Sequence, residues 1–257
     1  MSDWKPDLYL QFRNERTQPS IDLAMKIMAE KPRRILDIGC GPGNSTNVLR
    51  TRWPQAKIIG LDSSAAMIAE AKAKYPTIEW VCADASGDLA HLGRFDIVFS
   101  NAAIQWMPDH KRLLRTLFAM LNPGGVLAVQ APNVARMPVY IELRRLAASD
   151  KWKHRLTGLD RPHSRHGARF YYDIICGLSD MVALWETRYF HVMNTHADLV
   201  KWYSGTGLRP YLNCLADDAL RAGFLADLET ALRHVYPIQA DGKILFPFTR
   251  IFFTCGN

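Results

Sequence analysis

A short glycine-rich loop between two apolar segments constrains this chain more than any other feature. The apolar run 34–38 leads directly into Gly39-Cys40-Gly41-Pro42-Gly43, and a second apolar run, 57–61, ends on Asp62. Glycines let a backbone approach a ligand where any side chain would clash. A carboxylate that follows the next strand can accept hydrogen bonds from two ribose hydroxyls. The pattern therefore predicts a site for a cofactor that contains a nucleoside.

The loop differs from the two common phosphate-binding signatures. A dinucleotide fingerprint needs a glycine at position 44, where this chain has Asn44, and no Gly-Lys-Ser/Thr follows the loop. Asp37 precedes the glycines, and its negative charge would repel a pyrophosphate but attract an ammonium group. S-adenosylmethionine carries an amino-acid ammonium and a sulfonium, so its charge fits this loop.

Alternating strand and helix signals in the first half indicate a parallel sheet covered by helices on both faces. The expected strands are 34–38, 57–61, 78–82, 95–100, 125–130, 183–193 and 244–253. The expected helices are 44–52, 63–74, 108–121 and 173–179, with further helices within 196–236. Asn122-Pro123-Gly124-Gly125 should break the chain before the fifth strand, and Pro247 favours an edge position or a bulge in the last. We therefore predict an α/β fold with a seven-stranded Rossmann-like sheet.

Length and composition limit the class of protein. The 257 residues, of which 48% are hydrophobic, suffice for one large domain with a full core. The sequence has no run of about 18 apolar residues, and its N-terminal segment does not resemble a signal peptide. The five cysteines lie far apart without metal-ligand spacing. We expect reduced thiols, a cytoplasmic location and no bound metal, and the sequence does not indicate an oligomeric state.

Positive charge is concentrated in one stretch of the chain. The formal net charge is +7, and residues 133–170 contain nine basic and three acidic residues. Such a field suggests an anionic partner, either an acidic small molecule or a nucleic acid. The stretch lacks the regularly spaced aromatic residues that single-strand binders use, so a nucleic acid is the weaker alternative. A solvated helix face would also explain part of this charge.

Two more polar residues follow strand signals. Asp84 comes after the third expected strand and could accept a hydrogen bond from an exocyclic amine such as that of adenine. Asn101 follows the fourth, at the sheet edge where open α/β sheets bind ligands. Asp62 taken alone could instead cap a helix.

Together these residues resemble the class I S-adenosylmethionine-dependent methyltransferases. The matching elements are 36–43, Asp62, 83–84, 95–98 and 121–125, so the resemblance covers about residues 30–130. It implies that Gly39 and Gly41 pass the methionine part of the cofactor, that Asp62 binds the ribose and that Asp84 meets the adenine. Further cofactor contacts are expected from Asp37, Gly43, Asn44, Ser63, Met67, Ala85 and Asn101, and from Tyr9 and Arg16 of an N-terminal lid, residues 1–20.

Other segments resemble methyltransferases that esterify a small tricarboxylic acid. They are 2–4, Tyr9, Phe12, 101–110, 171–173 and 205–210, spread over the whole chain. The resemblance implies a tricarboxylate substrate and a monomethyl ester product. A carboxylate is already ionised at neutral pH, so no catalytic general base is expected. We expect a single domain, 1–257, in which 133–170 and 196–236 form a cap over the active site.

Arg209 is the strongest candidate for holding the acid. It follows a Gly-Thr-Gly turn, and the planar fork of an arginine makes two parallel bonds to a carboxylate. Gln105 and Trp106 are expected to wall the acceptor site, and Tyr171 could donate to a substrate carboxylate. Six other arginines are weaker candidates for binding the acid, and a structural role is the favoured interpretation of each: Arg13, Arg16, Arg161, Arg165, Arg169 and Arg250. Structural roles remain alternatives for all of these, and a binding module without catalysis remains an alternative for the chain.

Overall fold

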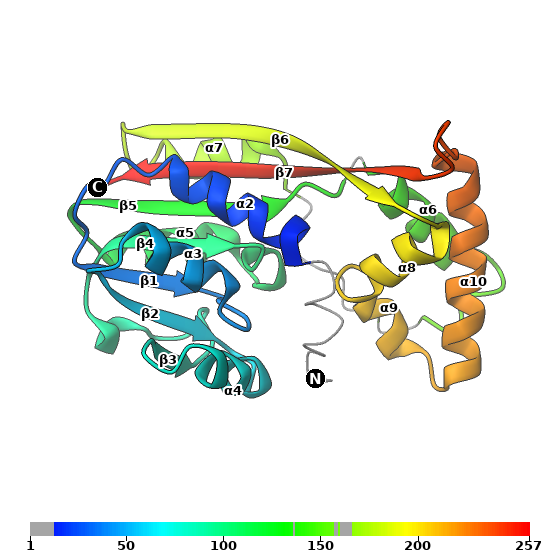
Figure 1. The fold of residues 1–257 in the computed structure, drawn as a ribbon, viewed down its shortest axis with the longest axis horizontal. Helices are drawn as coiled ribbons and strands as arrows, with labels where there is room; N and C mark the ends of the chain where they lie inside the picture. The colour runs from blue at the N-terminus through cyan, green and yellow to red at the C-terminus, as the bar shows by residue number, and fades with distance from the viewer. Residues whose placement is uncertain (1–12, 136, 157–158, 160–165) are drawn as a thin grey trace.

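The computed structural model describes residues 13–135, 137–156, 159 and 166–257. Within them, seven strands form one sheet in the order β3-β2-β1-β4-β5-β7-β6 (Figure 1). Their bounds are β1 (Arg34–Ile38), β2 (Lys57–Asp62), β3 (Glu79–Cys82), β4 (Phe95–Asn101), β5 (Leu121–Pro132), β6 (Val182–Met193) and β7 (Ile244–Gly256). The first five run parallel, whereas β7 is antiparallel to both β5 and β6. The predicted seven-stranded α/β sheet is confirmed.

Helices cover both faces of this sheet (Figure 1). Those packed along it are α2 (Arg13–Met25), α3 (Asn44–Arg52), α4 (Ala65–Lys74), α5 (His110–Ala119) and α7 (Ala168–Ile175). Leu23 of α2 and Leu49 of α3 are buried with Phe252 on one face, and Leu113 and Leu117 of α5 are buried on the other. Parallel strands need apolar cover on both faces, and these side chains provide it.

A second group of helices lies beyond the carboxyl ends of the parallel strands (Figure 1). It consists of α6 (Pro138–Ala147), α8 (His196–Ser204), α9 (Arg209–Cys214) and α10 (Asp218–Val235). These helices have a core of their own, in which Trp202, Tyr211 and Phe224 are almost completely shielded from solvent. The long strands β6 and β7 run from the sheet into this group and join the two parts. Short 3₁₀ helices η1 (Ala90–Leu92) and η2 (Ile104–Trp106) flank β4.

The two largest differences between the predicted and observed element bounds lie in α7 and β5. The helix expected at 173–179 is α7, which begins at Ala168 and packs on the sheet, because Tyr171 and Ile175 bury one of its faces. The break expected at 122–125 is a bulge inside β5, where the register with β4 shifts between Phe95 and Ile97. The sequence identified both elements, but it did not place where they begin.

Pro247 lies where β7 has only one neighbour. It pairs with Phe190 of β6, whereas the pairing of β5 with β7 ends at Pro132 and Arg250. The missing N–H of Pro247 therefore leaves no gap in a ladder with β5. The predicted edge position holds for this part of β7, although the strand is interior elsewhere.

Candidate active site

A cavity of about 500 Å³ opens at the carboxyl ends of β1, β2, β3 and β4. Carboxyl ends of parallel strands meet at one sheet edge, so residues far apart in sequence come together there. The predicted cofactor residues that line it are Gly39, Gly41, Asp62, Ser63, Met67, Asp84, Ala85 and Asn101, and Trp106 lines it too. Its volume is that of an ordinary small-molecule pocket.

Asp62 lies in the cavity wall and holds the glycine loop in place. Its two carboxylate oxygens accept hydrogen bonds from the backbone N–H groups of Gly41 and Ser64, both at 2.9 Å. Burial raises the pKa of Asp62, and the two N–H groups oppose that rise. An ionised carboxylate has about four acceptor positions, so two stay open to a ligand. Ser64, not Asp62, caps α4 by accepting from the Met67 N–H.

The three glycines of the loop have different roles, although all have positive φ. A Cβ on Gly39 would lie 2.1 Å from the Cβ of Ala103, so this position lets two loops pack together. A Cβ on Gly43 would meet the rings of Trp80 and Tyr75. A Cβ on Gly41 would meet no atom of the described residues within 4 Å. Only Gly41 therefore leaves open space on the cavity side of the loop.

Asp37 lies behind the loop and is completely buried. Its Oδ2 accepts from the hydroxyls of Ser45 and Thr46, which ties β1 to the start of α3. Burial raises the pKa of Asp37 to about 7, and the two hydroxyls oppose this. Its Oδ1 has no hydrogen-bond partner among the described residues. A cationic group reaching this oxygen would favour the ionised form.

The structure does not bring every predicted cofactor residue to the cavity. Asn44 accepts a hydrogen bond from Lys74 Nζ at 3.2 Å, and neither Asn44 nor Gly43 belongs to the cavity lining. Tyr9 lies outside the described residues. Arg16 is in α2, but its side chain is not described.

The loop after β4 forms one wall of the cavity, with Trp106, Met107 and Pro108 in its lining. Gln105 is not in the lining, and its Nε2 donates to the Ala102 carbonyl at 2.6 Å. Ala102 has φ 53°, a region that non-glycine residues rarely adopt. Strain of this kind concentrates at functional sites, where the surrounding structure enforces it.

Tyr171 is buried away from the cavity. Its hydroxyl lies 3.0 Å from His110 Nδ1, and His110 Nε2 lies 2.8 Å from the Ile104 carbonyl oxygen. A carbonyl only accepts, so Nε2 carries the proton and the Tyr171 hydroxyl donates to Nδ1. Burial raises the pKa of Tyr171, which keeps this hydroxyl protonated. Tyr171 therefore supports the loop after β4 from behind, through His110.

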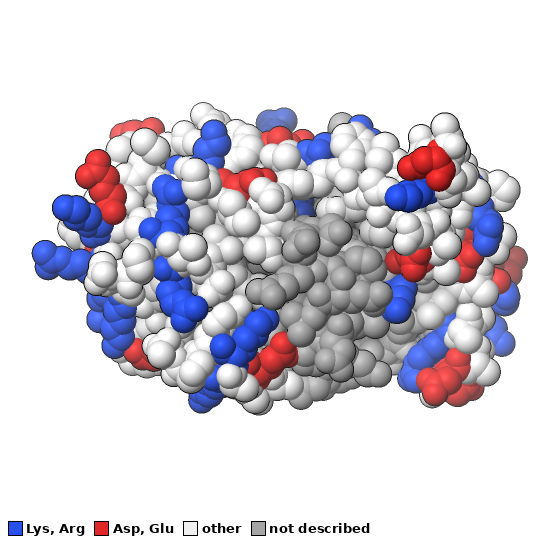
Figure 2. Space-filling model, viewed as in Figure 1, with Lys and Arg blue, Asp and Glu red and all other residues white. Residues whose placement is uncertain are grey.

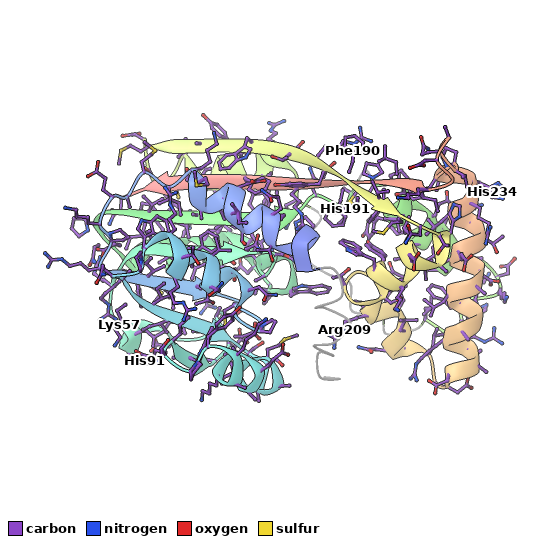
Figure 3. The ribbon with its side chains drawn as sticks, viewed as in Figure 1. Lys57, His91, Phe190, His191, Arg209 and His234 are labelled. Carbon is purple, nitrogen blue, oxygen red and sulfur yellow. The ribbon has the colours of Figure 1, made fainter. Side chains whose placement is uncertain are left out.

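Arg209 stands on the opposite side, at the start of α9. The turn before it begins at Gly205, the C-cap of α8, and a Cβ on Gly207 would lie 2.4 Å from the ring of Tyr203. Arg209 is half-buried and lies on the side of α9 that faces the sheet (Figure 3). The structure thus directs one predicted acceptor residue toward the sheet edge that carries the cavity.

Comparisons with known proteins identify the family. A family model described as a methyltransferase domain matches residues 35–125. A trans-aconitate 2-methyltransferase of Escherichia coli (strain 55989 / EAEC) is 41% identical over 98% of this chain and 97% of its own length. Another, of Rhodopseudomonas palustris (strain BisB18), is 40% identical over 98% of both chains. This chain belongs to the trans-aconitate 2-methyltransferase family.

Solved structures agree with the fold of this family member. The YcgJ protein of Bacillus subtilis has a TM-score of 0.60 at 16% identity, covering 93% of this chain and 98% of that one. Phosphoethanolamine N-methyltransferase 2 of Haemonchus contortus, solved with S-adenosylhomocysteine, has a TM-score of 0.54 at 16% identity, covering 93% of this chain and 52% of that one. These likenesses support the methyltransferase fold alone. The predicted membership of the class I methyltransferases is confirmed.

Sequence reasoning missed several residues that line the cavity of this trans-aconitate 2-methyltransferase family member. Ala83, Ser86, Ala103 and Met107 lie in the lining beside the predicted residues. Ala83 directly follows β3 and Ala103 comes two residues after β4, so their place after a strand is a signal that could have found them. Ser86 and Met107 lie farther along these loops and carry no such signal. No group of three or more His, Cys, Asp or Glu residues in the described chain could hold a metal ion, and none of its helices could span a membrane.

Part of the basic stretch forms ion pairs on the surface of the second helix group. Lys151 lies 2.6 Å from Asp227, and Lys153 lies 2.5 Å from Asp150. On the face shown in Figure 2, basic side chains of this region stand among acidic ones. Exposed pairs of this kind contribute about 0–1 kcal/mol each. They support the interpretation of a solvated surface for this part of the stretch.

Proposed function

We propose that this chain transfers the methyl group of S-adenosylmethionine to a carboxylate of trans-aconitate, which gives a monomethyl ester and S-adenosylhomocysteine. The observation that carries the proposal is the cavity at the carboxyl edge of the sheet, in a chain that matches its trans-aconitate 2-methyltransferase relatives over 98% of its length. Gly41, Asp62 and Asp84 meet in that cavity.

The residues present fit this cofactor. Gly41 leaves room for a ligand against the backbone, and the buried Oδ1 of Asp37 is an acceptor without a partner among the described residues. Asp62 would accept from the ribose hydroxyls, Asp84 from the adenine amine, and the charge of Asp37 would attract the ammonium. When bound, the cofactor supplies a methyl group on a sulfonium, which is open to attack by a nucleophile.

The acceptor needs little chemical activation. A carboxylate is ionised at neutral pH, so the task of the protein is to align the reacting atoms and exclude water. Trp106 and Met107 give the cavity an apolar wall, and its lining among the described residues includes no His, Cys or Lys. Arg209 would hold one spectator carboxylate from the second helix group.

Three further predictions stay proposals. Residues 1–20 would act as a lid that brings Tyr9 and Arg16 to the cofactor. The segments 133–170 and 196–236 would cap the active site. The cytoplasmic location predicted from the cysteines is the third.

The test is an assay with methyl-labelled S-adenosylmethionine. Trans-aconitate should yield a base-labile methyl ester and an equal amount of S-adenosylhomocysteine, with cis-aconitate, isocitrate, citrate and RNA tried in parallel. Arg209→Ala should raise the KM for the acid at least about 30-fold while the KM for the cofactor stays unchanged. Arg233→Ala is a matched control, because Arg233 forms an exposed pair with Glu229 on α10. Formation of no ester from any of the acids would overturn the proposal.

A further inference from the structure

Buried polar side chains continue from the cofactor cavity across one face of the sheet. Asn101 lines the cavity and is the register partner of Gln130 in β5. Directly paired residues of neighbouring strands point to the same face, so Gln130 lies next to Asn101. Arg250 of β7 then donates from Nη1 to Gln130 Oε1 at 3.4 Å. Gln130 is 0% exposed and Arg250 is 4% exposed.

This pair stands at the edge of the sheet that carries the cavity. The pairing of β5 with β7 ends at Pro132 and Arg250, where the chain leaves β5 toward α6. The same edge faces the second helix group, on which Arg209 lies (Figure 3). Gln130 and Arg250 therefore stand at the sheet edge that faces the helix group carrying Arg209.

Gln130 has unused hydrogen-bonding capacity. Its Nε2 is buried and has no partner among the residues that the structure describes, and the Oδ1 of its neighbour Asn101 is in the same condition. Leaving a buried polar group unsatisfied costs about 1–3 kcal/mol, so each case needs an explanation. An amide N–H beside a guanidinium is a donor set for an anion, and a carboxylate matches it.

The surroundings of Arg250 strengthen this donor set. Its guanidinium carbon lies 4.6 Å from the ring centre of Phe248 and 5.9 Å from that of Tyr189. Tyr189 in turn donates its hydroxyl to Asp22 of α2, which also accepts from Gln18. Aromatic walls hold the guanidinium in place and exclude water, which increases the strength of a charged hydrogen bond.

We propose that Gln130 and Arg250 form a second carboxylate subsite for the acid substrate. This inference rests on the proposed function. A tricarboxylate that presents one carboxylate to the methyl donor has two others to bind. Arg209 takes one from the second helix group, and Gln130 with Arg250 takes the other from the sheet. The subsite thereby makes the enzyme select tricarboxylates over dicarboxylates of similar size.

Gln130→Glu separates a binding role from a structural one. The change is nearly isosteric and places the new carboxylate beside the Arg250 guanidinium, so the buried charge is paired and the fold should be kept. The same carboxylate occupies the subsite and repels the acid. Calorimetry in the presence of S-adenosylhomocysteine should show the Kd for trans-aconitate raised at least about 30-fold, with the Kd for S-adenosylhomocysteine unchanged.

A second variant and a control complete the test. Arg250→Lys keeps the charge but loses the planar fork, so acid binding should weaken about tenfold. Arg188→Lys is the control, because Arg188 is an exposed arginine of the neighbouring strand β6. This change should leave the affinity for the acid unchanged. A dicarboxylate analogue should bind the wild type about 30-fold more weakly than trans-aconitate and lose little more in Gln130→Glu.

The outcomes distinguish the two proposals. If the wild type binds trans-aconitate and both variants bind it within twofold of that affinity, the subsite is overturned and the proposed function stands. If the wild type binds no tricarboxylate in the presence of S-adenosylhomocysteine, both are overturned.

Discussion

The carboxylate of Asp62 accepts a hydrogen bond from the backbone N–H of Gly41 at 2.9 Å, which joins the end of β2 to the loop after β1. The acid expected to bind the ribose therefore also shapes the loop expected to pass the methionine part of the cofactor. Changes at either residue should affect cofactor binding, for reasons that can be separated by experiment.

Asp62→Asn should lower the affinity for S-adenosylmethionine at least about tenfold. The amide keeps one acceptor oxygen but loses the negative charge and the second acceptor oxygen. Asp150→Asn is the control, because Asp150 is an exposed acid in a surface pair with Lys153. Calorimetry with both variants checks this. Equal cofactor affinity in Asp62→Asn and the wild type would remove Asp62 from the binding site.

Gly41→Ala and Gly39→Ala should differ in kind. At Gly41 the new methyl group meets no atom of the described residues, so backbone strain costs only about 1–2 kcal/mol of stability while the cofactor is blocked. At Gly39 the methyl group meets Ala103, which adds an overpacking cost of about 1–3 kcal/mol. Denaturant unfolding and cofactor titration check both variants. A Gly41→Ala protein with normal cofactor affinity would contradict the assignment of this loop.

The raised pKa of Asp37 predicts a pH-dependent stability of the ligand-free protein. Burial raises that pKa from 3.8 to about 7, so the folded state holds the proton more tightly than the unfolded state. The resulting stabilisation is complete below pH 3.8 and is lost as the pH rises through about 7. It amounts to a few kcal/mol, because each tenfold difference in proton affinity between the two states contributes about 1.4 kcal/mol.

Asp37→Asn should therefore flatten the fall in unfolding free energy between about pH 5 and pH 8. Urea unfolding of wild type and variant at several pH values measures this. The raised pKa of Asp62 acts in the same direction in both proteins, so only their difference reports on Asp37. Parallel curves for the two proteins would show that Asp37 is ionised in the ligand-free state.

Tyr171→Phe should destabilise the protein without weakening acid binding. The change removes the hydrogen bond between the Tyr171 hydroxyl and His110 Nδ1, at a cost of about 0.5–1.5 kcal/mol. Tyr171 lies outside the cavity lining, so the KM for the acid should stay unchanged. Tyr172→Phe is the matched control, since Tyr172 is 50% exposed and should tolerate the change. A large rise in the KM for the acid with normal stability would show that Tyr171 belongs to the acceptor site.

The sequence predicted much of the cavity lining at the sheet edge, because that lining depends on local signals. Apolar runs that end on Asp62 and Asn101, and glycines that must adopt positive φ, are visible without a structure. The acceptor side depends on contacts between distant segments. Gln130 and Arg250 are 120 residues apart and meet only through the register of an antiparallel pair.

Residue type alone could not separate exposed from buried roles either. Tyr171 and Tyr172 are adjacent and identical in chemistry, yet one is buried against His110 and the other is half-exposed. The orientation of α7 about its own axis decides which of the two tyrosines faces the sheet. That orientation depends on a helix that begins at Ala168, and the sequence did not reveal this start.

Carboxylate methylation is tested most directly by a single turnover. Enzyme loaded with one equivalent of methyl-labelled S-adenosylmethionine is mixed with excess trans-aconitate, and ester and S-adenosylhomocysteine are counted between about pH 6.5 and pH 9. We predict one monomethyl ester for each cofactor bound, at a rate that does not change with pH, because the acceptor is already ionised. Two results would contradict carboxylate methylation. One is a bound cofactor that yields no ester, and the other is a rate that rises about tenfold per pH unit, as expected for an acceptor that must first lose a proton.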